Sequence, residues 1–205
     1  MLYLILSAVF SYLLGSISPS IIISKMLFGE DIRKTGSGNA GASNTVRVFG
    51  KKAGLLVFLL DFAKGFIAVI IARILVCFGG DYICIPVAGF FAQLGHIFPI
   101  FFGFRGGKGV ATAVGCAMAV MPTVAVILLI LFIAILILSK TVALASGICA
   151  ALYPLLAYFL SDINKTIHLI FAACCSVIII IKHLDNFVRL LDGSEPKLSF
   201  GKKKE

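Results

Sequence analysis

Long apolar segments occupy most of this chain, and they restrict the possible folds more than any other feature of the sequence. Several apolar runs approach or exceed about 17 residues, the length at which a helix begins to span the hydrocarbon core of a bilayer. With 60% hydrophobic and only 13% charged residues among 205, the composition also differs from that of a soluble domain. We therefore predict an all-α fold, a polytopic helical bundle in a membrane that forms one domain over residues 1–205.

The alternation of apolar and polar segments predicts about seven transmembrane helices. We interpret the apolar start of the chain as a membrane span rather than a cleaved signal, with a second half that residues 15–19 loosen. Residues 110–138 are compatible with one long helix or two short ones, because Pro122 removes a helical hydrogen bond and disfavours helix before it. The predicted spans are 1–24, 54–76, 83–102, 110–121, 122–138, 141–160 and 166–182.

The distribution of positive charge decides between one and two helices in residues 110–138. The positive-inside rule places the basic segments on the cytoplasmic side, so an even number of crossings must lie between residues 109 and 182. Two helices satisfy this requirement, with the N-terminus outside and the C-terminus cytoplasmic. The basic residues are concentrated in 25–53, in 103–109, at Lys140 and in the tail from Lys182.

This topology requires an unusually short helix. Residues 110–121 cover only about 18 Å, whereas the hydrocarbon core is about 30 Å thick. We expect either a half-helix inside the bundle or a locally thinner bilayer. Arg73 and Lys165 are the basic exceptions on the outer side, and each lies near a span end from which it can reach the interface.

The remaining charged and polar residues have simpler interpretations. The net charge of +9 does not indicate nucleic-acid binding, because the charges lie between spans rather than on one soluble face. Asp61 and Lys64 are one helical turn apart inside a span, so we expect an ion pair that supports residues 31–54 rather than direct chemistry. His168 is expected to be structural, and the six cysteines are expected to pack as small hydrophobic residues.

The segment 95–112 is typical of an anion-binding site. It contains five glycines, a histidine and two cations between apolar stretches, and glycines allow backbone N–H groups to approach a ligand closely. A basic loop that only sets the topology is the alternative. The residues predicted to take part are His96, Arg105, Gly106, Gly107, Lys108 and Gly109.

The segment 31–54 combines small residues, hydroxyl and amide side chains, and positive charge. Its glycines match the dinucleotide pattern G-x-G-x-x-G, but no strand–helix–strand unit fits between two membrane spans, so a nucleotide site is not predicted. Phosphate suits this mixture of groups, with an ordinary solvated loop as the alternative. The candidate ligands are Gly36, Ser37, Gly38, Asn39, Gly41, Ser43, Asn44 and Arg47, with Arg33, Lys51 and Lys52 as further charges.

The segment 182–197 predicts a short amphipathic helix. His183, Asn186 and Arg189 recur at helical spacing and share one face, while the other face is apolar. A helix that rests on the bilayer surface explains this pattern as well as a role in a site does, and one helix can do both.

These three motifs, in this order and between these spans, resemble the acyl-phosphate:glycerol-3-phosphate acyltransferases of bacterial membranes (the PlsY type). The resemblance implies a seven-span fold with a site that faces the cytoplasm, in the bacterial inner membrane. Its carriers are Gly-Ser-Gly-Asn-Ala-Gly-Ala-Ser-Asn at 36–44 with Arg47, Gly-His-Ile-Phe-Pro at 95–99 with Arg-Gly-Gly-Lys-Gly at 105–109, and His183, Asn186 and Arg189.

The chain departs from the family pattern at a few positions. Ser43 replaces the usual threonine and keeps its hydroxyl group. Ala143 replaces a frequent serine in the loop at 139–146, which leaves Ser146 as a modest candidate there.

The resemblance implies that acyl phosphate and sn-glycerol 3-phosphate give 1-acyl-glycerol 3-phosphate and phosphate, the first acylation of phospholipid biosynthesis. We expect Ser37 to face the developing oxyanion, Arg47 and Lys108 to hold phosphate, and His183 with Asn186 to position glycerol phosphate. The proton acceptor is either His183 or a phosphate of the substrate. No metal or cofactor is implied, and the enzyme that produces acyl phosphate is a candidate partner.

Two other classes of function are compatible with polar residues in a membrane bundle. An organic-phosphate transporter or channel would also place basic residues near broken helices, but the two halves of the sequence share no repeated pattern. A non-enzymatic scaffold would gain nothing from buried polar clusters. The acyltransferase function that the resemblance implies is therefore the one we expect.

Overall fold

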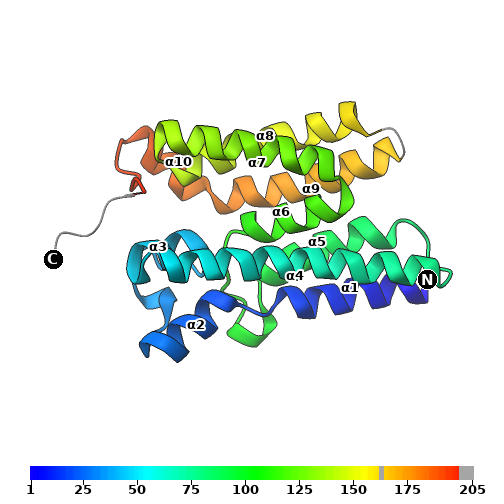
Figure 1. The fold of residues 1–205 in the computed structure, drawn as a ribbon, viewed down its shortest axis with the longest axis horizontal. Coiled ribbons are helices and arrows are strands. Elements are labelled where there is room, and N and C mark those ends of the chain that lie inside the picture. Colours follow the sequence, from blue (N-terminus) through cyan, green and yellow to red (C-terminus); the bar gives the residue numbers. More distant parts are fainter. Residues whose placement is uncertain (162–163, 199–205) are drawn as a thin grey trace.

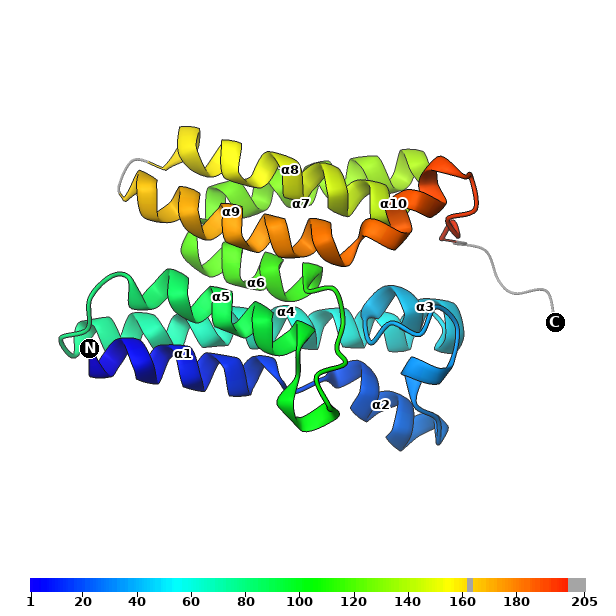
Figure 2. The same cartoon turned by 180° about the vertical axis from the view of Figure 1, so that it is seen from behind.

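The structure, a computed structural model, describes residues 1–161 and 164–198, and this part of the chain is helical throughout, without a strand (Figures 1 and 2). Residues 162–163, in the segment predicted to separate the last two spans, and the basic residues at 202–204 lie outside the described residues. The α-helices are α1 Leu2–Gly15, α2 Pro19–Phe28, α3 Ala42–Phe49, α4 Lys51–Cys77, α5 Cys84–Ile97, α6 Val110–Val120, α7 Pro122–Ser139, α8 Val142–Leu160, α9 Lys165–Lys182 and α10 Leu184–Leu191, with 3-10 turns at Ile32–Lys34 and Ile100–Phe102.

The prediction of an all-α polytopic bundle is confirmed. Among the described residues, six helical segments are long and apolar enough to cross a membrane, and α6 is a shorter apolar helix. The start of α1 and the helix α10 lie at opposite ends of the bundle, as an odd number of crossings requires (Figures 1 and 2). Which end faces the cytoplasm stays a prediction.

Residues 110–138 form two helices rather than one. Pro122 occupies the first turn of α7, and the non-helical backbone of Met121 separates the two. The short helix α6 packs against α4, α5 and α7, and most of its residues are buried. A helix of 11 residues can therefore lie inside the bundle although it covers only about 16 Å.

Arg73, which we expected near the outer membrane interface, is exposed and also contacts the short helix α6. Its Nε and Nη2 atoms donate hydrogen bonds to the carbonyl oxygen of Ala119, at 3.1 and 2.7 Å. This carbonyl group belongs to the last turn of α6, where carbonyl oxygens have no N–H group of the same helix to accept from. Arg73 therefore caps the short helix from the neighbouring α4.

The first predicted span, 1–24, is divided into α1 and α2. Gly15 lies directly against the backbone of Ala92 on α5, where a side chain would collide, so α1 and α5 pack closely. In the break that follows, the carbonyl oxygen of Ile17 accepts a hydrogen bond of 2.6 Å from Lys64 Nζ. The expected loosening is thus a complete break that α4 stabilises with a polar contact.

The short helix α6 lies between two groups of helices (Figures 1 and 2). One group contains α1, α4 and α5, and the other contains α7, α8 and α9. The main hydrophobic core continues through α6 from Val69 on α4 to Tyr153 on α8 and Phe171 on α9. Because the chain enters α6 from the turn at 103–109, this turn lies at the boundary between the two groups.

Two predictions about polar residues away from this turn are also resolved. The ring of His168 forms hydrogen bonds with Tyr82 Oη at 2.6 Å and with Ser161 Oγ at 2.9 Å, so it is a satisfied structural histidine. All six cysteines are free, and three of them are buried.

Candidate active site

Asn44 organises the loop that precedes α3. Its side chain is 1% exposed, and its Oδ1 atom accepts a hydrogen bond of 2.8 Å from the backbone N–H of Ser37. Its Nδ2 atom donates to the carbonyl oxygens of Ile32, Thr35 and Asn39 at 3.0–3.2 Å. Asn44 is therefore a structural residue of the site and not the phosphate ligand expected from the sequence. The backbone N–H of Ser37 is also occupied, which leaves its exposed hydroxyl group for a substrate.

Arg33 joins this loop to the next one instead of binding phosphate. Its Nε and Nη2 atoms donate to the carboxylate of Asp31 at 3.0 and 2.7 Å, and its Nη1 atom donates to the carbonyl oxygen of Phe102 at 2.7 Å. The hydrogen bonds from Arg33 hold the pKa of Asp31 well below its usual range. Arg47, in contrast, has no hydrogen-bonding or ionic partner within the part of the chain that the structure describes.

The glycines of the second loop are required by close packing. The backbone N–H groups of Gly106 and Gly107 donate to the carbonyl oxygens of Ile97 and His96, each at 3.2 Å. A Cβ atom on Gly107 would collide with the His96 ring and with the carbonyl oxygen of Ala40. These two N–H groups therefore close the turn and are not free to bind an anion, contrary to the expectation that the glycines expose them to a ligand.

The third segment connects to Lys108 through a chain of polar contacts. Lys108 Nζ donates a hydrogen bond to Asn186 Oδ1. Asn186 Nδ2 donates to Glu195 Oε1 at 2.6 Å, and Arg189 Nε donates to Glu195 Oε2 at 2.8 Å. Glu195 was not predicted as a site residue, and the sequence does not single it out, because Asp185 and Asp192 lie in the same segment.

The helix α10 turns its polar face into the site. Asn186 is buried there, and Phe187 packs against the α carbon of Gly147 on α8, where a side chain would collide. On the opposite face, Val188 and Leu191 are 58% and 89% exposed. The amphipathic helix expected from the sequence is therefore present, with one face in the site and an apolar face available to the bilayer.

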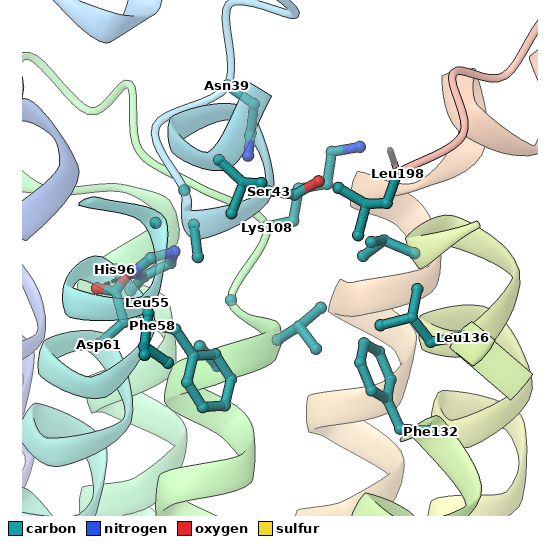
Figure 3. Close-up of a pocket in the computed structure, with 18 of the residues that line it drawn as sticks. Asn39, Ser43, Leu55, Phe58, Asp61, His96, Lys108, Phe132, Leu136 and Leu198 are labelled. Carbon is teal, nitrogen blue, oxygen red and sulfur yellow. Dashed lines mark hydrogen bonds and ion pairs between the residues drawn. The ribbon is translucent and has the colours of Figure 1, made fainter. Parts of the chain in front are cut away.

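Two cavities meet at these three segments (Figure 3). One, of about 630 Å³, is polar and is lined by charged and amide side chains that include Arg47, Lys182 and Arg189. The other, of about 410 Å³, lies between Leu55 and Phe58 on one wall and Phe132 and Leu136 on the other. The residues that line both cavities are Asn39, Ser43, Lys108, Val142 and His183.

Every predicted site residue except Arg105 and Gly106 lines one of these cavities. The polar cavity is lined by Gly36, Ser37, Gly38, Asn44, Arg47, Gly107, Asn186 and Arg189, and the apolar one by Gly41, His96 and Gly109. Arg105 is exposed on the outer side of the turn. It lines neither cavity, so its expected role as a phosphate ligand stays a prediction that the structure does not support.

Burial gives Lys108 an unusual acid–base character. Desolvation is the largest cause that lowers its pKa, to about 8, and the nearby cations Arg189 and Arg47 lower it further. The carboxylates of Glu195 and Asp185 oppose this effect. Lys108 therefore carries its charge at neutral pH and loses it under mildly alkaline conditions.

His183 is neutral at physiological pH. Burial is the main reason that its pKa is lowered to about 4, and the positive charge of Lys108 contributes. Its Nδ1 atom lies 2.8 Å from the carbonyl oxygen of Ile179 and donates to it, which leaves Nε2 as an acceptor. His183 can therefore accept a hydrogen bond from a substrate hydroxyl group, but it is a weak base.

The expected ion pair between Asp61 and Lys64 is present, with Lys64 Nζ 2.8 Å from Asp61 Oδ1. Asp61 forms a hydrogen bond with His96, and Lys64 donates one to the carbonyl oxygen of Ile17. Neither of these bonds reaches the segment 31–54. The pair therefore supports the second loop rather than the first. Ser146 lines a separate apolar cavity of about 50 Å³ and contributes to neither of the two described above.

Comparison with known proteins places the chain in a family. The family described as glycerol-3-phosphate acyltransferase matches residues 5–193. The chain is 44% identical over 187 residues to the glycerol-3-phosphate acyltransferase of Aquifex aeolicus, covering 91% of this chain and 95% of the relative. It is 40% identical over 197 residues to that of Coxiella burnetii, covering 95% and 97%.

The chain belongs to the glycerol-3-phosphate acyltransferase family. Two crystal structures of PlsY (YgiH), an integral membrane glycerol 3-phosphate acyltransferase, have the same fold. The glycerol 3-phosphate form superposes with a TM-score of 0.87 at 41% identity and 96% coverage of each chain. The lysophosphatidic acid form gives 0.84 at 39% identity, covering 96% of this chain and 95% of that one. The chain is thus a multi-pass membrane acyltransferase, and the transporter alternative is not favoured.

The kcat/KM of the acyltransferase is expected to fall about tenfold per pH unit above about pH 8. Lys108 must be protonated to hold an anion, and a rise in pH through its lowered pKa of about 8 removes that charge. The measurement is kcat/KM against pH, which reports the free enzyme. Lys108→Arg keeps a permanent charge and should lack this alkaline limb, whereas a wild-type profile that is flat to about pH 10 contradicts the assignment.

Replacement of Glu195 by glutamine is expected to reduce kcat/KM by about tenfold or more and to lower the melting temperature. A carboxylate accepts from both Asn186 and Arg189, whereas an amide has one acceptor oxygen and must turn an N–H toward the other donor. Steady-state kinetics and a thermal unfolding curve in detergent measure the two effects. Asp192→Asn is the control, because it removes the same charge from an exposed position nearby, and an equal loss in both variants contradicts the expectation.

Proposed function

We propose that the acyl donor of this enzyme is an acyl phosphate and that the acceptor is the primary hydroxyl group of sn-glycerol 3-phosphate. The hydroxyl oxygen attacks the acyl carbon, the bond from that carbon to the phosphate oxygen breaks, and inorganic phosphate leaves. The products are lysophosphatidic acid and phosphate, and the hydroxyl proton passes to a phosphate oxygen. The relatives of known structure were crystallised in a glycerol 3-phosphate form and a lysophosphatidic acid form, which supports this acceptor and this product.

One observation carries the proposal: the polar cavity and the apolar cavity share Asn39, Ser43, Lys108, Val142 and His183. An acyl-transfer site must hold an anionic acceptor and a long acyl chain with their reacting atoms in contact. A polar cavity with excess positive charge suits the first, and a cavity walled by Leu55, Phe58 and Phe132 suits the second. The shared residues then surround the reacting atoms.

This geometry supports specific roles for the residues of the site. Lys108 and Arg47 hold phosphate oxygens and stabilise the charge that develops as phosphate leaves. The hydroxyl group of Ser37 donates to a phosphoryl or carbonyl oxygen. His183 accepts a hydrogen bond from the attacking hydroxyl group and orients it. Because the pKa of His183 is about 4, the departing phosphate is the better proton acceptor.

We also propose that the site opens to the cytoplasm of a bacterial inner membrane. The helices α3 and α10 lie at one end of the bundle (Figure 1), and the polar cavity there is also lined by Gly107 and Lys108. The positive-inside rule assigns such a basic end to the cytoplasm. An enzyme that produces acyl phosphate would deliver its product on this side, and it remains the expected partner.

The reaction can be tested with purified protein in detergent micelles. Palmitoyl phosphate and radiolabelled glycerol 3-phosphate should give labelled lysophosphatidic acid and one equivalent of inorganic phosphate. Palmitoyl-CoA in place of palmitoyl phosphate should give no product. Product from palmitoyl-CoA alone would overturn the proposed donor, and no product from either donor would overturn the proposed reaction.

A further inference from the structure

A buried polar cluster within the membrane-spanning part of the enzyme has no role in the reaction described above. Asp61 and Lys64 on α4 and His96 on α5 are 1%, 5% and 5% exposed. Ionisable side chains inside membrane helices are expensive to bury, and they usually serve a function. The cluster forms part of the wall of the apolar cavity, where Asp61 and His96 lie side by side across from Lys108 (Figure 3).

The three side chains hold one another in a fixed arrangement. Asp61 Oδ1 lies 2.8 Å from Lys64 Nζ and 3.1 Å from His96 Nδ1, and Lys64 Nζ lies 2.9 Å from His96 Nδ1. Lys64 also donates to the carbonyl oxygen of Ile17. The Nδ1 side of the imidazole ring is therefore held by the ion pair in either tautomer, and the ring cannot rotate without breaking these contacts.

The other side of the His96 ring lies against the turn that carries Lys108. A Cβ atom on Gly107 would collide with His96 Nε2 and Cε1, so this edge of the ring packs directly on the Gly107 α carbon. The backbone of the same histidine accepts the hydrogen bond from the Gly107 N–H group. The carbonyl oxygen of Ala40 in the first loop lies beside the same position of Gly107. The ring and this carbonyl group together therefore fix the place of Gly107, and Lys108 is the next residue.

We propose that the Asp61–Lys64 ion pair is a positioning device for acyl transfer, which fixes the His96 ring against Gly107 and thereby sets the place of the Lys108 ammonium group. Asp61, Lys64 and His96 are positioning residues on this view, and Lys108 is the residue that touches substrate. The inference rests on the proposed role of Lys108. It replaces the sequence-based expectation that His96 binds phosphate directly.

The competing explanation is that the cluster only stabilises the fold, by tying α4 to α5 and to the break between α1 and α2. The double variant Asp61→Leu/Lys64→Met separates the two explanations. It removes both charges together and keeps similar volumes, and buried ion pairs replaced in this way often leave stability unchanged, whereas removal of one partner leaves a buried charge alone. A structural role predicts that a folded double variant is as active as the wild type.

Positioning predicts a different result for the double variant. Its melting temperature should stay close to that of the wild type, while kcat falls by about tenfold or more. A second readout needs no substrate: the rate at which acetic anhydride acetylates Lys108, followed by mass spectrometry, should change by about threefold or more. Lys34, which is exposed and has no side-chain partner among the described residues, is the internal reference and should react at an unchanged rate.

Two further variants complete the test. His96→Ala removes the ring but leaves the ion pair intact, so it decides the question if the double variant does not fold, and it should change the acetylation of Lys108 in the same way. His168→Phe is the matched control, because it removes another buried histidine that contacts neither cavity, and it should leave kcat and Lys108 reactivity unchanged.

Each outcome bears on the inference. Wild-type kcat and wild-type Lys108 reactivity in the folded double variant, or in His96→Ala, overturn it. A change in Lys108 reactivity with the predicted loss of kcat supports it. If the wild-type enzyme makes no lysophosphatidic acid from palmitoyl phosphate, the proposed function fails, but the acetylation rates still report whether the cluster positions Lys108.

Discussion

Replacement of Lys108 by alanine is expected to lower kcat/KM by about 10²–10³, which corresponds to about 2.7–4 kcal/mol of transition-state stabilisation. Within the described part of the chain, Lys108 is the one positively charged residue that lines both the polar and the apolar cavity. His183 lines both as well, but it is neutral. In the proposed reaction the ammonium group of Lys108 therefore lies where the phosphate of the donor and the acyl carbon meet. The measurement is the initial rate of lysophosphatidic acid formation with both substrates varied.

Arg105→Ala is the control for this prediction. It removes a cation three residues away in the same turn, but from an exposed position outside both cavities. We expect a loss smaller than about tenfold, because an exposed charge acts only through a screened field. Equal losses in Arg105→Ala and Lys108→Ala would show that the net charge of the turn matters and that the cavity does not select Lys108.

Replacement of Arg47 by alanine is expected to lower kcat/KM by about 10²-fold or more with little change in stability. Arg47 lines the polar cavity, and it has no hydrogen bond or ion pair among residues 1–161 and 164–198 that alanine would break. Its guanidinium group can therefore meet a phosphate with two parallel hydrogen bonds, and Arg47→Lys should recover only part of the activity. Kinetics and a thermal unfolding curve on the same preparation measure both quantities.

Arg33→Ala should give the opposite result. Arg33 donates to Asp31 and to the carbonyl oxygen of Phe102, so its removal leaves this carbonyl oxygen without a donor and leaves Asp31 with only the backbone N–H group of residue 33 and Lys25. We expect this loss to lower the free energy of unfolding by about 1–3 kcal/mol. Two arginines in one polar segment are thus expected to affect different properties. A loss of stability in Arg47→Ala that equals the loss in Arg33→Ala would contradict this separation.

The contrast between these two arginines shows where sequence patterns stop being informative. Both lie in a glycine-rich, basic segment, where Arg47 was a candidate phosphate ligand and Arg33 a further positive charge. Asn44 is a third example, because an amide between glycines suits an anion, yet its four polar contacts all go to its own loop. Residue type gives the chemistry that a side chain can perform. Which group the side chain forms a hydrogen bond with depends on contacts between distant segments.

The membrane topology could be predicted from the sequence more completely than the contacts of the site. The break at Pro122 was left open by helix propensity, but charge on the flanking loops selected two helices, and the structure contains them. The sequence did not reveal that the first span is broken into α1 and α2, or that Arg73 and Lys64 supply hydrogen bonds to the carbonyl groups at these breaks. Both contacts join residues more than 40 positions apart.

By itself, the sequence determined that the chain is a helical membrane protein, and it predicted that three separated polar segments form a site suited to phosphate. These conclusions depend on hydrophobic length, loop charge and residue type, all of which are local properties of the chain. Only the tertiary structure decided that Lys108 lines both cavities and Arg105 lines neither, that Glu195 joins Asn186 to Arg189, and that the Asp61–Lys64 pair holds His96. Each of these contacts depends on which polar groups lie within hydrogen-bonding distance of one another. Packing between segments that are far apart in the chain determines those distances.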